Sequence, residues 1–177
     1  TSGCSPLTVV FADQSTGPVT GWQWDFGNSN VSNLQNPIAT YNAPGTYTVV
    51  LTVTDGSNND TKTEVGYITV FQNPSASFSA TTPTSGCAPL TVTFDDLSVQ
   101  GDGAIVDYLW DFGDGQISNN GNPNPTHTYN TAGTYPVSLQ ITDVNGCSSS
   151  FLINNYIQVS DPPVASFTAD VTSACSP

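Results

Sequence analysis

The sequence has almost no basic side chains and no segment that could cross a membrane as a helix. Its single lysine or arginine, Lys62, stands against 14 acidic residues in 177, which gives a formal net charge of −13. Nucleic acids and anionic lipids both attract lysine and arginine. No apolar run approaches the roughly 18 residues of a transmembrane helix, and no signal-like leader opens the chain. These absences argue against nucleic acid or membrane partners.

Side chains suited to catalysis are also scarce. His127 is the only histidine, the residue most often used for general acid–base chemistry near neutral pH. No nucleophile motif places a serine or cysteine beside it. The sequence therefore predicts that the chain is not an enzyme and needs no resident cofactor.

Apolar and polar residues alternate with a period of two, which is typical of half-buried strands. Short strands are expected at 7–11, 21–26 and 66–71, and Asn145-Gly146 favours a type I′ hairpin turn. No segment carries a helical apolar stripe, so an all-β fold is predicted. Two equivalent strands should face a core through Tyr47, Val49, Leu51 and Val53, and through Tyr135, Val137, Leu139 and Ile141.

The chain repeats itself. Cys4-Ser-Pro-Leu-Thr-Val returns as Cys87-Ala-Pro-Leu-Thr-Val, and Trp24-Asp-Phe-Gly returns as Trp110-Asp-Phe-Gly. A third copy begins near Cys175, with the cysteines 83 and 88 residues apart. We predict a first module at 1–72 that lacks its first strand and a second module at 75–160. Residues 164–177 are then the first strand of a further module or a strand donated to another subunit.

These motifs resemble the PKD domain family, whose signature Trp-Asp-Phe-Gly-Asp-Gly stands intact at 110–115. The resemblance implies tandem immunoglobulin-like β-sandwiches with no shared catalytic residues, used as stalks, spacers or adhesive units in surface proteins and secreted hydrolases. The first copy departs from it at Asn28-Ser29 and at Ala39, the counterpart of His127. The signature core and turn residues are Trp24, Asp25, Tyr47, Trp110, Asp111 and Tyr135. We expect Asp25 and Asp111 to accept backbone N–H bonds in turns.

Calcium is the one metal that the acidic loops suggest. Calcium takes six to eight oxygen ligands, and loops at one end of a sandwich can bring carboxylates together. Solvated loop carboxylates are the simpler interpretation, because the spacing matches no EF-hand. In addition, the first copy has only one clear counterpart of these residues, Asp13, which aligns with Asp96. The candidate ligands are Asp95, Asp96, Asp102 and Asp107.

The four cysteines allow three complete pairings. The repeat favours Cys87 with Cys147 inside the second module, because Asn59 stands in the first copy where Cys147 stands in the second. Cys4 and Cys175 are then thiols for bonds between modules or subunits. A disulfide indicates an oxidising, extracellular setting. The sequons at Asn30 and Asn59 add glycans as a further expectation and favour a glycosylated cell-surface protein.

The interpretation that these features favour is an extracellular structural rod that builds a filament, stalk or surface layer from copies of itself or from adjoining PKD modules. Proline-containing linkers at 72–74 and 160–163 favour a stiff rod. The C-terminal strand could complete the first module of a neighbouring subunit by donor-strand exchange. The alternative is a carbohydrate- or protein-binding accessory module of a secreted hydrolase. That alternative needs an exposed aromatic such as Trp22, although its alternation with Trp24 favours burial.

Overall fold

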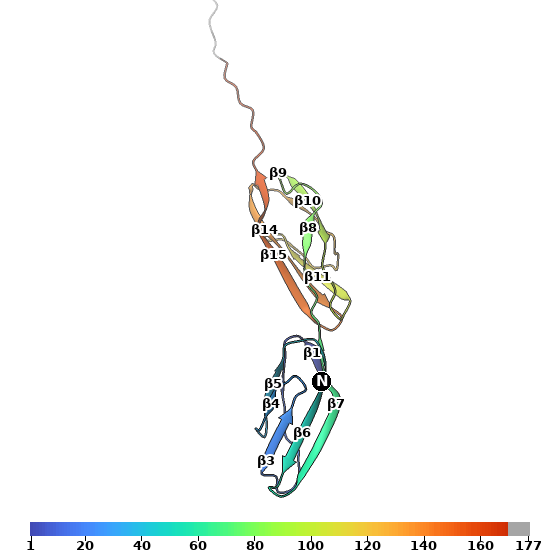
Figure 1. Ribbon diagram of the computed structural model, residues 1–177. Coiled ribbons are helices and arrows are strands. Elements are labelled where there is room, and N and C mark those ends of the chain that lie inside the picture. The colour runs from blue at the N-terminus through green and yellow to red at the C-terminus, as the bar shows by residue number, and fades with distance from the viewer. Residues whose placement is uncertain (170–177) are drawn as a thin grey trace, which may run out of the picture.

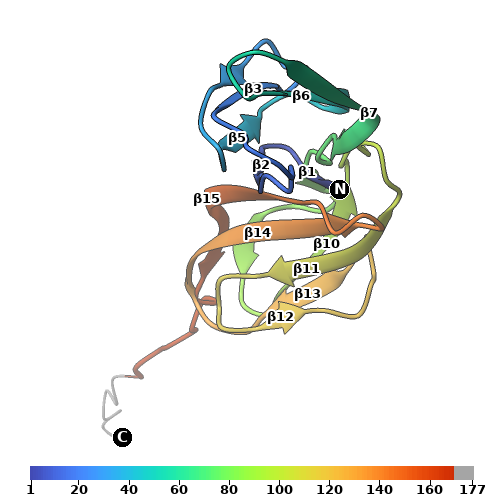
Figure 2. The same ribbon diagram turned by 90° about the horizontal axis from the view of Figure 1, so that it is seen from below.

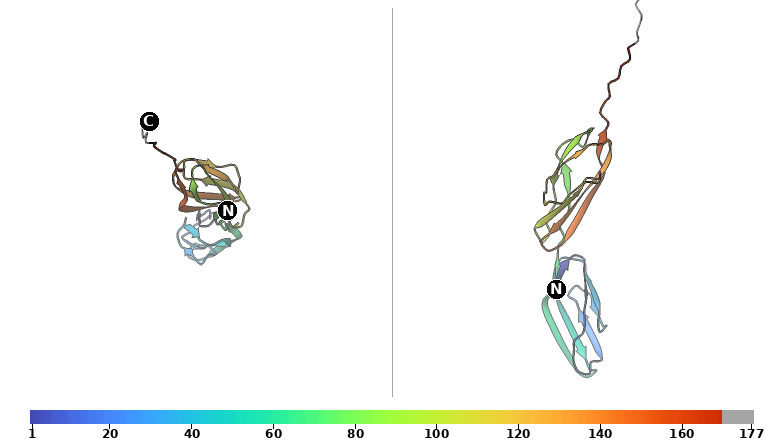
Figure 3. Two further views of the ribbon diagram at one scale, coloured as in Figure 1. Left: turned by 90° about the horizontal axis from the view of Figure 1, so that it is seen from above. Right: turned by 180° about the vertical axis from the view of Figure 1, so that it is seen from behind.

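In a computed structural model that describes residues 1–169, the chain forms two β-sandwiches joined end to end (Figures 1 and 3). These residues contain no helix, so none of them forms a membrane-spanning helix. Module 1 is built from β1 (Ser2–Cys4), β2 (Leu7–Val10), β3 (Gly21–Asp25), β4 (Val31–Ser32), β5 (Ile38–Tyr41), β6 (Gly45–Thr54) and β7 (Asn59–Phe71). Module 2 is built from β8 (Phe78–Ala80), β9 (Ser85–Cys87), β10 (Leu90–Asp96), β11 (Ile105–Asp111), β12 (Ile117–Ser118), β13 (Thr126–Tyr129), β14 (Gly133–Asp143) and β15 (Ser148–Ser160).

The two modules share one topology and differ by one strand. Module 1 pairs a five-stranded sheet, β1-β7-β6-β3-β4, with the two-stranded sheet β2-β5. Module 2 pairs the equivalent sheet, β9-β15-β14-β11-β12, with the three-stranded sheet β8-β10-β13. Figure 2 shows β14 lying between β15 and β11. The additional strand is β8, which has no counterpart among β1–β7.

The alternation of β14 is confirmed by its burial, because Val137, Leu139 and Ile141 are fully buried in the core of module 2. Module 1 matches this pattern only in part. Val49 is 4% exposed, but Leu51 and Val53 are half-buried. The alternation decides which face of the sheet a side chain lies on. Complete burial also requires that another strand covers that face.

The turn between β14 and β15 is not the type I′ turn expected from Asn145-Gly146. Gly146 has a positive φ of 81°, but Asn145 is not among the residues with positive φ, and type I′ needs both. The Gly146 N–H donates to the Asp143 carbonyl at 3.0 Å, so Val144 and Asn145 are the central residues of the turn. The glycine instead follows the turn, as in three-residue hairpin loops.

Candidate functional site

A disulfide joins the two modules. Cys4 bonds to Cys147 with a Cα–Cα separation of 5.4 Å. Cys4 ends β1 and lies opposite Phe71, where β7 runs into the linker. Cys147 is fully buried in the hairpin between β14 and β15. The bond therefore ties the exit of module 1 to the nearest hairpin of module 2, and Cys4 is an inter-module cysteine.

The predicted Cys87–Cys147 bond is wrong, because the two residues lie at opposite ends of module 2. Cys87 is aligned with Ser160 at the end of β15, whereas Cys147 comes just before its start. A strand of 13 residues spans about 40 Å, and a disulfide needs Cα atoms within about 7 Å. Cys87 is exposed and has no partner within residues 1–169, and Cys175 lies outside these residues.

The counterpart of Cys147 in module 1 also needs correction. The Asp143 N–H donates to the Cys147 carbonyl, and the equivalent Asp55 N–H donates to the carbonyl of Asn58 rather than of Asn59. The hairpin of module 1 is one residue shorter. It still contains no cysteine.

The linker is fixed to both modules by hydrogen bonds. From module 2, Asp102 accepts the Gln72 N–H at 2.7 Å through Oδ2 and donates its own N–H to the Gln72 carbonyl at 3.2 Å. Toward module 1, the Asn73 side chain donates to the Ser5 carbonyl at 2.7 Å. A Cβ on Gly101 would lie 2.1 Å from the Gln72 oxygen, so the loop and linker pack too closely for a side chain there. These contacts hold the short linker from both sides.

The structure does not bring the candidate calcium ligands together. Asp102 holds the linker, Asp96 Oδ1 accepts the Ser98 N–H at 3.0 Å, and Asp107 Oδ1 accepts the Tyr108 N–H at 3.0 Å. Asp95 lies within β10 opposite Ser79. No group of three potential ligands occurs within residues 1–169. Asp102, Asp96 and Asp107 each accept a backbone N–H instead, from the linker in the first case and from a near neighbour in the other two.

The signature residues build the turn that follows β3 in module 1 and β11 in module 2. Trp24 and Trp110 are buried at 6% and 0% exposure. Asp25 and Asp111 accept N–H bonds from the glycines two residues later, at 2.8 and 2.9 Å, which is the predicted turn role. Tyr47 and Tyr135 each donate the phenolic O–H to the carbonyl four residues earlier, at 2.7 and 2.8 Å.

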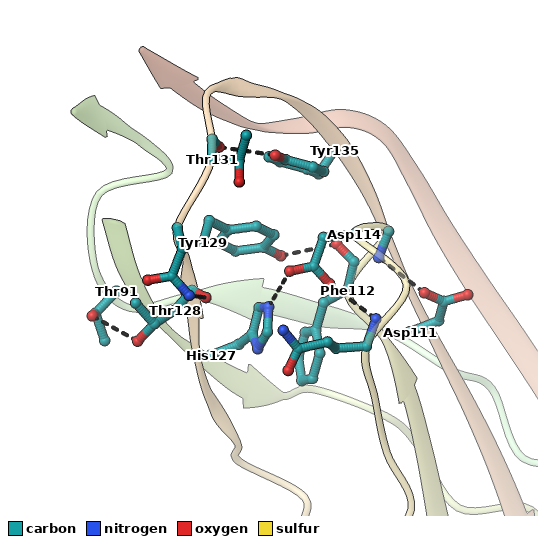
Figure 4. A network of polar contacts seen from close by, with 12 residues as sticks. Thr91, Asp111, Phe112, Asp114, His127, Thr128, Tyr129, Thr131 and Tyr135 are labelled. Carbon is teal, nitrogen blue, oxygen red and sulfur yellow. Dashed lines mark hydrogen bonds and ion pairs between the residues drawn. The ribbon is translucent and has the colours of Figure 1, made fainter. Parts of the chain in front are cut away.

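His127 and Asp114 form a nearly buried pair in module 2, with His127 Nε2 2.8 Å from Asp114 Oδ2 (Figure 4). The imidazole stacks on Phe112 with centroids 4.1 Å apart and meets Tyr129 edge-on at 4.6 Å. Tyr129 donates to the Phe112 carbonyl at 3.1 Å, and burial raises its pKa well above the usual tyrosine range. This network packs the signature turn against β13.

Module 1 replaces both members of this pair. Asn28 stands for Asp114 and Ala39 for His127. Asn28 donates instead to the Thr40 carbonyl at 3.1 Å, and Ala39 is buried. Both positions differ between the two repeats, and this joint difference is the signal in the sequence that could have linked the two residues.

Trp22 is half-buried and does not form an exposed aromatic platform. Its indole N–H donates to Asp13 Oδ2 at 2.7 Å. Burial raises the pKa of Asp13, but hydrogen bonds from Ser15, Trp22 and Gln35 outweigh this effect and hold it at about 2. Trp22 is thus engaged within module 1. The sequon residues Asn30 and Asn59 are both exposed, and their glycosylation stays a prediction.

Module 1 carries a groove of about 700 Å³ beside its two-stranded sheet. Its lining contains both apolar and polar side chains. Phe11, Trp24 and Leu51 are among the apolar lining residues, and Lys62 and Tyr67 also line the groove. The groove lies on the module that the repeat predicts to lack its first strand.

The fold and these signature turns define a class of protein. The family model described as PKD domain matches residues 1–70 and 72–159. The chain belongs to the PKD domain family, as two immunoglobulin-like modules in tandem. The resemblance seen in the sequence is confirmed.

Among curated relatives, the chain is 30% identical over 151 residues to the pre-pro-metalloprotease PrtV of Vibrio cholerae, covering 85% of this chain and 16% of that protein. It is 40% identical over 92 residues to collagenase ColA of Clostridium perfringens, covering 51% of this chain and 8% of the collagenase. The solved PKD1 domain of PrtV is 38% identical, with a TM-score of 0.43, over 51% of this chain and 99% of that domain. The chain thus spans less than a fifth of these two relatives.

Proposed function

We propose that this chain is a non-catalytic spacer of a larger extracellular protein, holding the parts at its two ends at a fixed distance and orientation. The observation that carries the proposal is the junction, where the Cys4–Cys147 disulfide and the hydrogen bonds of Asp102 and Asn73 act on one short linker. A disulfide forms and persists in an oxidising compartment, which supports the extracellular setting. The relatives that carry such modules are named as a metalloprotease and a collagenase, which supports an accessory role beside a hydrolase.

A spacer differs from a ligand-binding accessory module in having no saturable ligand. A sugar-binding platform needs an exposed aromatic side chain, for which Trp22 was the candidate. Trp22 is half-buried and its indole N–H donates a hydrogen bond to Asp13. The test is a titration of the oxidised chain with fibrillar collagen and soluble oligosaccharides, followed by co-sedimentation and by tryptophan fluorescence. The spacer function predicts no saturable signal. Saturable binding that is lost in Trp22→Ala would move the assignment to the binding module.

The second candidate function is a filament, stalk or surface layer built from copies of the chain. It is favoured by a different observation, namely that two like modules follow each other in tandem along the chain.

A further inference from the structure

The Cys4–Cys147 disulfide encloses most of both modules in one covalent loop. The loop takes in residues 5–146, which include every strand from β2 to β14. Of the residues that the structure describes, only 1–3 and 148–169 lie outside the loop and the two cysteines. A single break in the backbone between residues 5 and 146 therefore leaves the chain in one covalent piece.

One peptide bond inside this loop is open to a trypsin-like protease. Such an enzyme cuts after lysine or arginine, and Lys62 is the only such residue among the 177. Lys62 lies on β7, its side chain is 75% exposed, and it forms an ion pair with Glu64 at 3.0 Å. Here β7 pairs with β6 on one side, whereas β1 reaches only residues 69–71 on the other. An extended strand with a free edge is a form in which a second protein can bind it.

A cut at this position divides module 1 between two chains. Water adds across the peptide bond, so that Lys62 gains a carboxyl group and the next residue an amine, and the fragments are 1–62 and 63–177. The larger fragment keeps the end of β7, whose Ile68 and Val70 are buried in the core of module 1 at 0% and 1% exposure. The smaller fragment keeps β6 and β1, which pair with this end of β7. The two fragments therefore share one core.

The disulfide joins the two fragments beside the strands that they share. Cys4 lies opposite Phe71, where β1 pairs with the end of β7, and the Ser5 N–H donates to the Phe71 carbonyl at 3.0 Å. Cys147 belongs to the larger fragment, and its Cα lies 5.4 Å from that of Cys4. The bond therefore keeps the end of β7 next to β1 after the backbone of β7 is broken.

A covalent connection changes how two fragments associate. Without it, the fragments of a cut chain are held only by noncovalent contacts and separate on dilution. With it, their association is intramolecular, and the effective concentration for a short connection is of the order of millimolar. This value does not fall when the protein is diluted, so the cut chain stays assembled.

We propose that the Cys4–Cys147 disulfide is a retaining bond, which keeps both modules folded and connected after an endoprotease has cut the chain between residues 5 and 146. For a trypsin-like enzyme, the cut is the one after Lys62. This role deepens the proposed spacer function and rests on it, because a spacer has to keep the parts at its two ends connected. The shape of the molecule then outlasts a break in its backbone.

The test is to treat the oxidised 177-residue chain with trypsin and to follow it by sedimentation velocity over a hundredfold dilution and by small-angle X-ray scattering. Denaturing gels should show one species without reductant and the fragments 1–62 and 63–177 with reductant. The mass and scattering curve of the cut chain should match those of the uncut chain at every concentration. The matched control is Cys4→Ser, which lacks the bond. After the same cut, its mean mass should fall on dilution toward that of separate fragments.

A second cut site covers the case in which trypsin does not reach β7. Asn119→Lys places a basic side chain in the exposed loop between β12 and β13, inside the same covalent loop. The oxidised variant should again keep its mass and scattering curve after cleavage. The double variant with Cys4→Ser should lose both on dilution.

Separation or unfolding of the cut, oxidised chain overturns the proposal, as does a cut Cys4→Ser chain that stays assembled at every dilution. A chain that trypsin leaves intact at both sites also overturns it, because there is then no cut for the bond to withstand. These outcomes do not touch the spacer function, which is tested on the uncut chain by the collagen and oligosaccharide titration. Saturable binding in that titration would contradict the spacer function even where the cut chain stays assembled.

Discussion

At the residue scale, the position of a cysteine along its strand decides which neighbour it can reach. Cys4 and Cys87 hold the same place in their modules, each beside the end of the last strand. Cys147 lies at the opposite end of module 2, next to the linker. It can therefore reach the exit of module 1 but not Cys87.

Alkylation without reductant tests this pairing. With iodoacetamide under native conditions, we expect full modification of the exposed Cys87, while Cys4 and Cys147 are recovered in one cross-linked peptide on mass-spectrometric mapping. Reduced and denatured protein is the control and should be modified at all four cysteines. A cross-linked peptide joining Cys87 to Cys147 would contradict the structure.

The His127–Asp114 pair makes a second prediction at this scale. His127→Ala leaves a mostly buried carboxylate without its partner, and we expect a loss of about 1–3 kcal/mol in the unfolding free energy of module 2. Adding Asp114→Asn recreates the combination found in module 1 and should recover part of that loss. Urea unfolding of the two single variants and the double variant measures the coupling. Additive losses would show that the two side chains do not act as a pair.

At the scale of strands and turns, the signature turn depends on glycine at one position in particular. Gly113 has a φ of 80°, and a Cβ there would lie 2.1 Å from the Pro136 oxygen on the neighbouring strand. Gly115, two residues later, has a φ of 89° but no atom within 4 Å of such a Cβ. A substitution at Gly115 therefore costs only backbone strain, whereas one at Gly113 costs backbone strain and a steric clash.

We therefore expect Gly113→Ala to destabilise module 2 by about 3 kcal/mol or more and Gly115→Ala by about 1 kcal/mol, the cost of the left-handed conformation alone. Thermal unfolding of both variants compares them directly. Equal losses would mean that the close approach to Pro136 contributes nothing.

Local patterns predicted these elements well, and contacts between distant elements much less so. Alternation placed the core faces of β6 and β14, and the repeat identified the modules and the signature turns. The predicted Cys87–Cys147 pairing was wrong because the repeat does not show at which end of the module each cysteine lies. That depends on the direction in which β15 runs. Asp102 was one of the candidate calcium ligands, beside the simpler interpretation of a solvated loop carboxylate. Neither interpretation predicted its bond to the linker, because a carboxylate that accepts a linker N–H looks the same in the sequence as one that binds metal.

At the scale of the whole molecule, the account rests on the junction. The disulfide closes a loop of 143 residues across two modules. In the chain-entropy model, the lost conformational entropy raises the free energy of the unfolded chain by about 5 kcal/mol. In the folded molecule it adds a second covalent connection beside the linker. Two connections restrict bending and twisting that a single linker would allow.

Small-angle X-ray scattering of the dilute chain, with and without reductant, tests this most directly. Oxidised protein should scatter as one rod of fixed shape, whereas reduced protein and a Cys4→Ser variant should show a broader range of inter-module orientations. Both modules should stay folded throughout by circular dichroism. Oxidised and reduced curves that coincide, with the broad distribution of flexibly linked modules, would contradict the account.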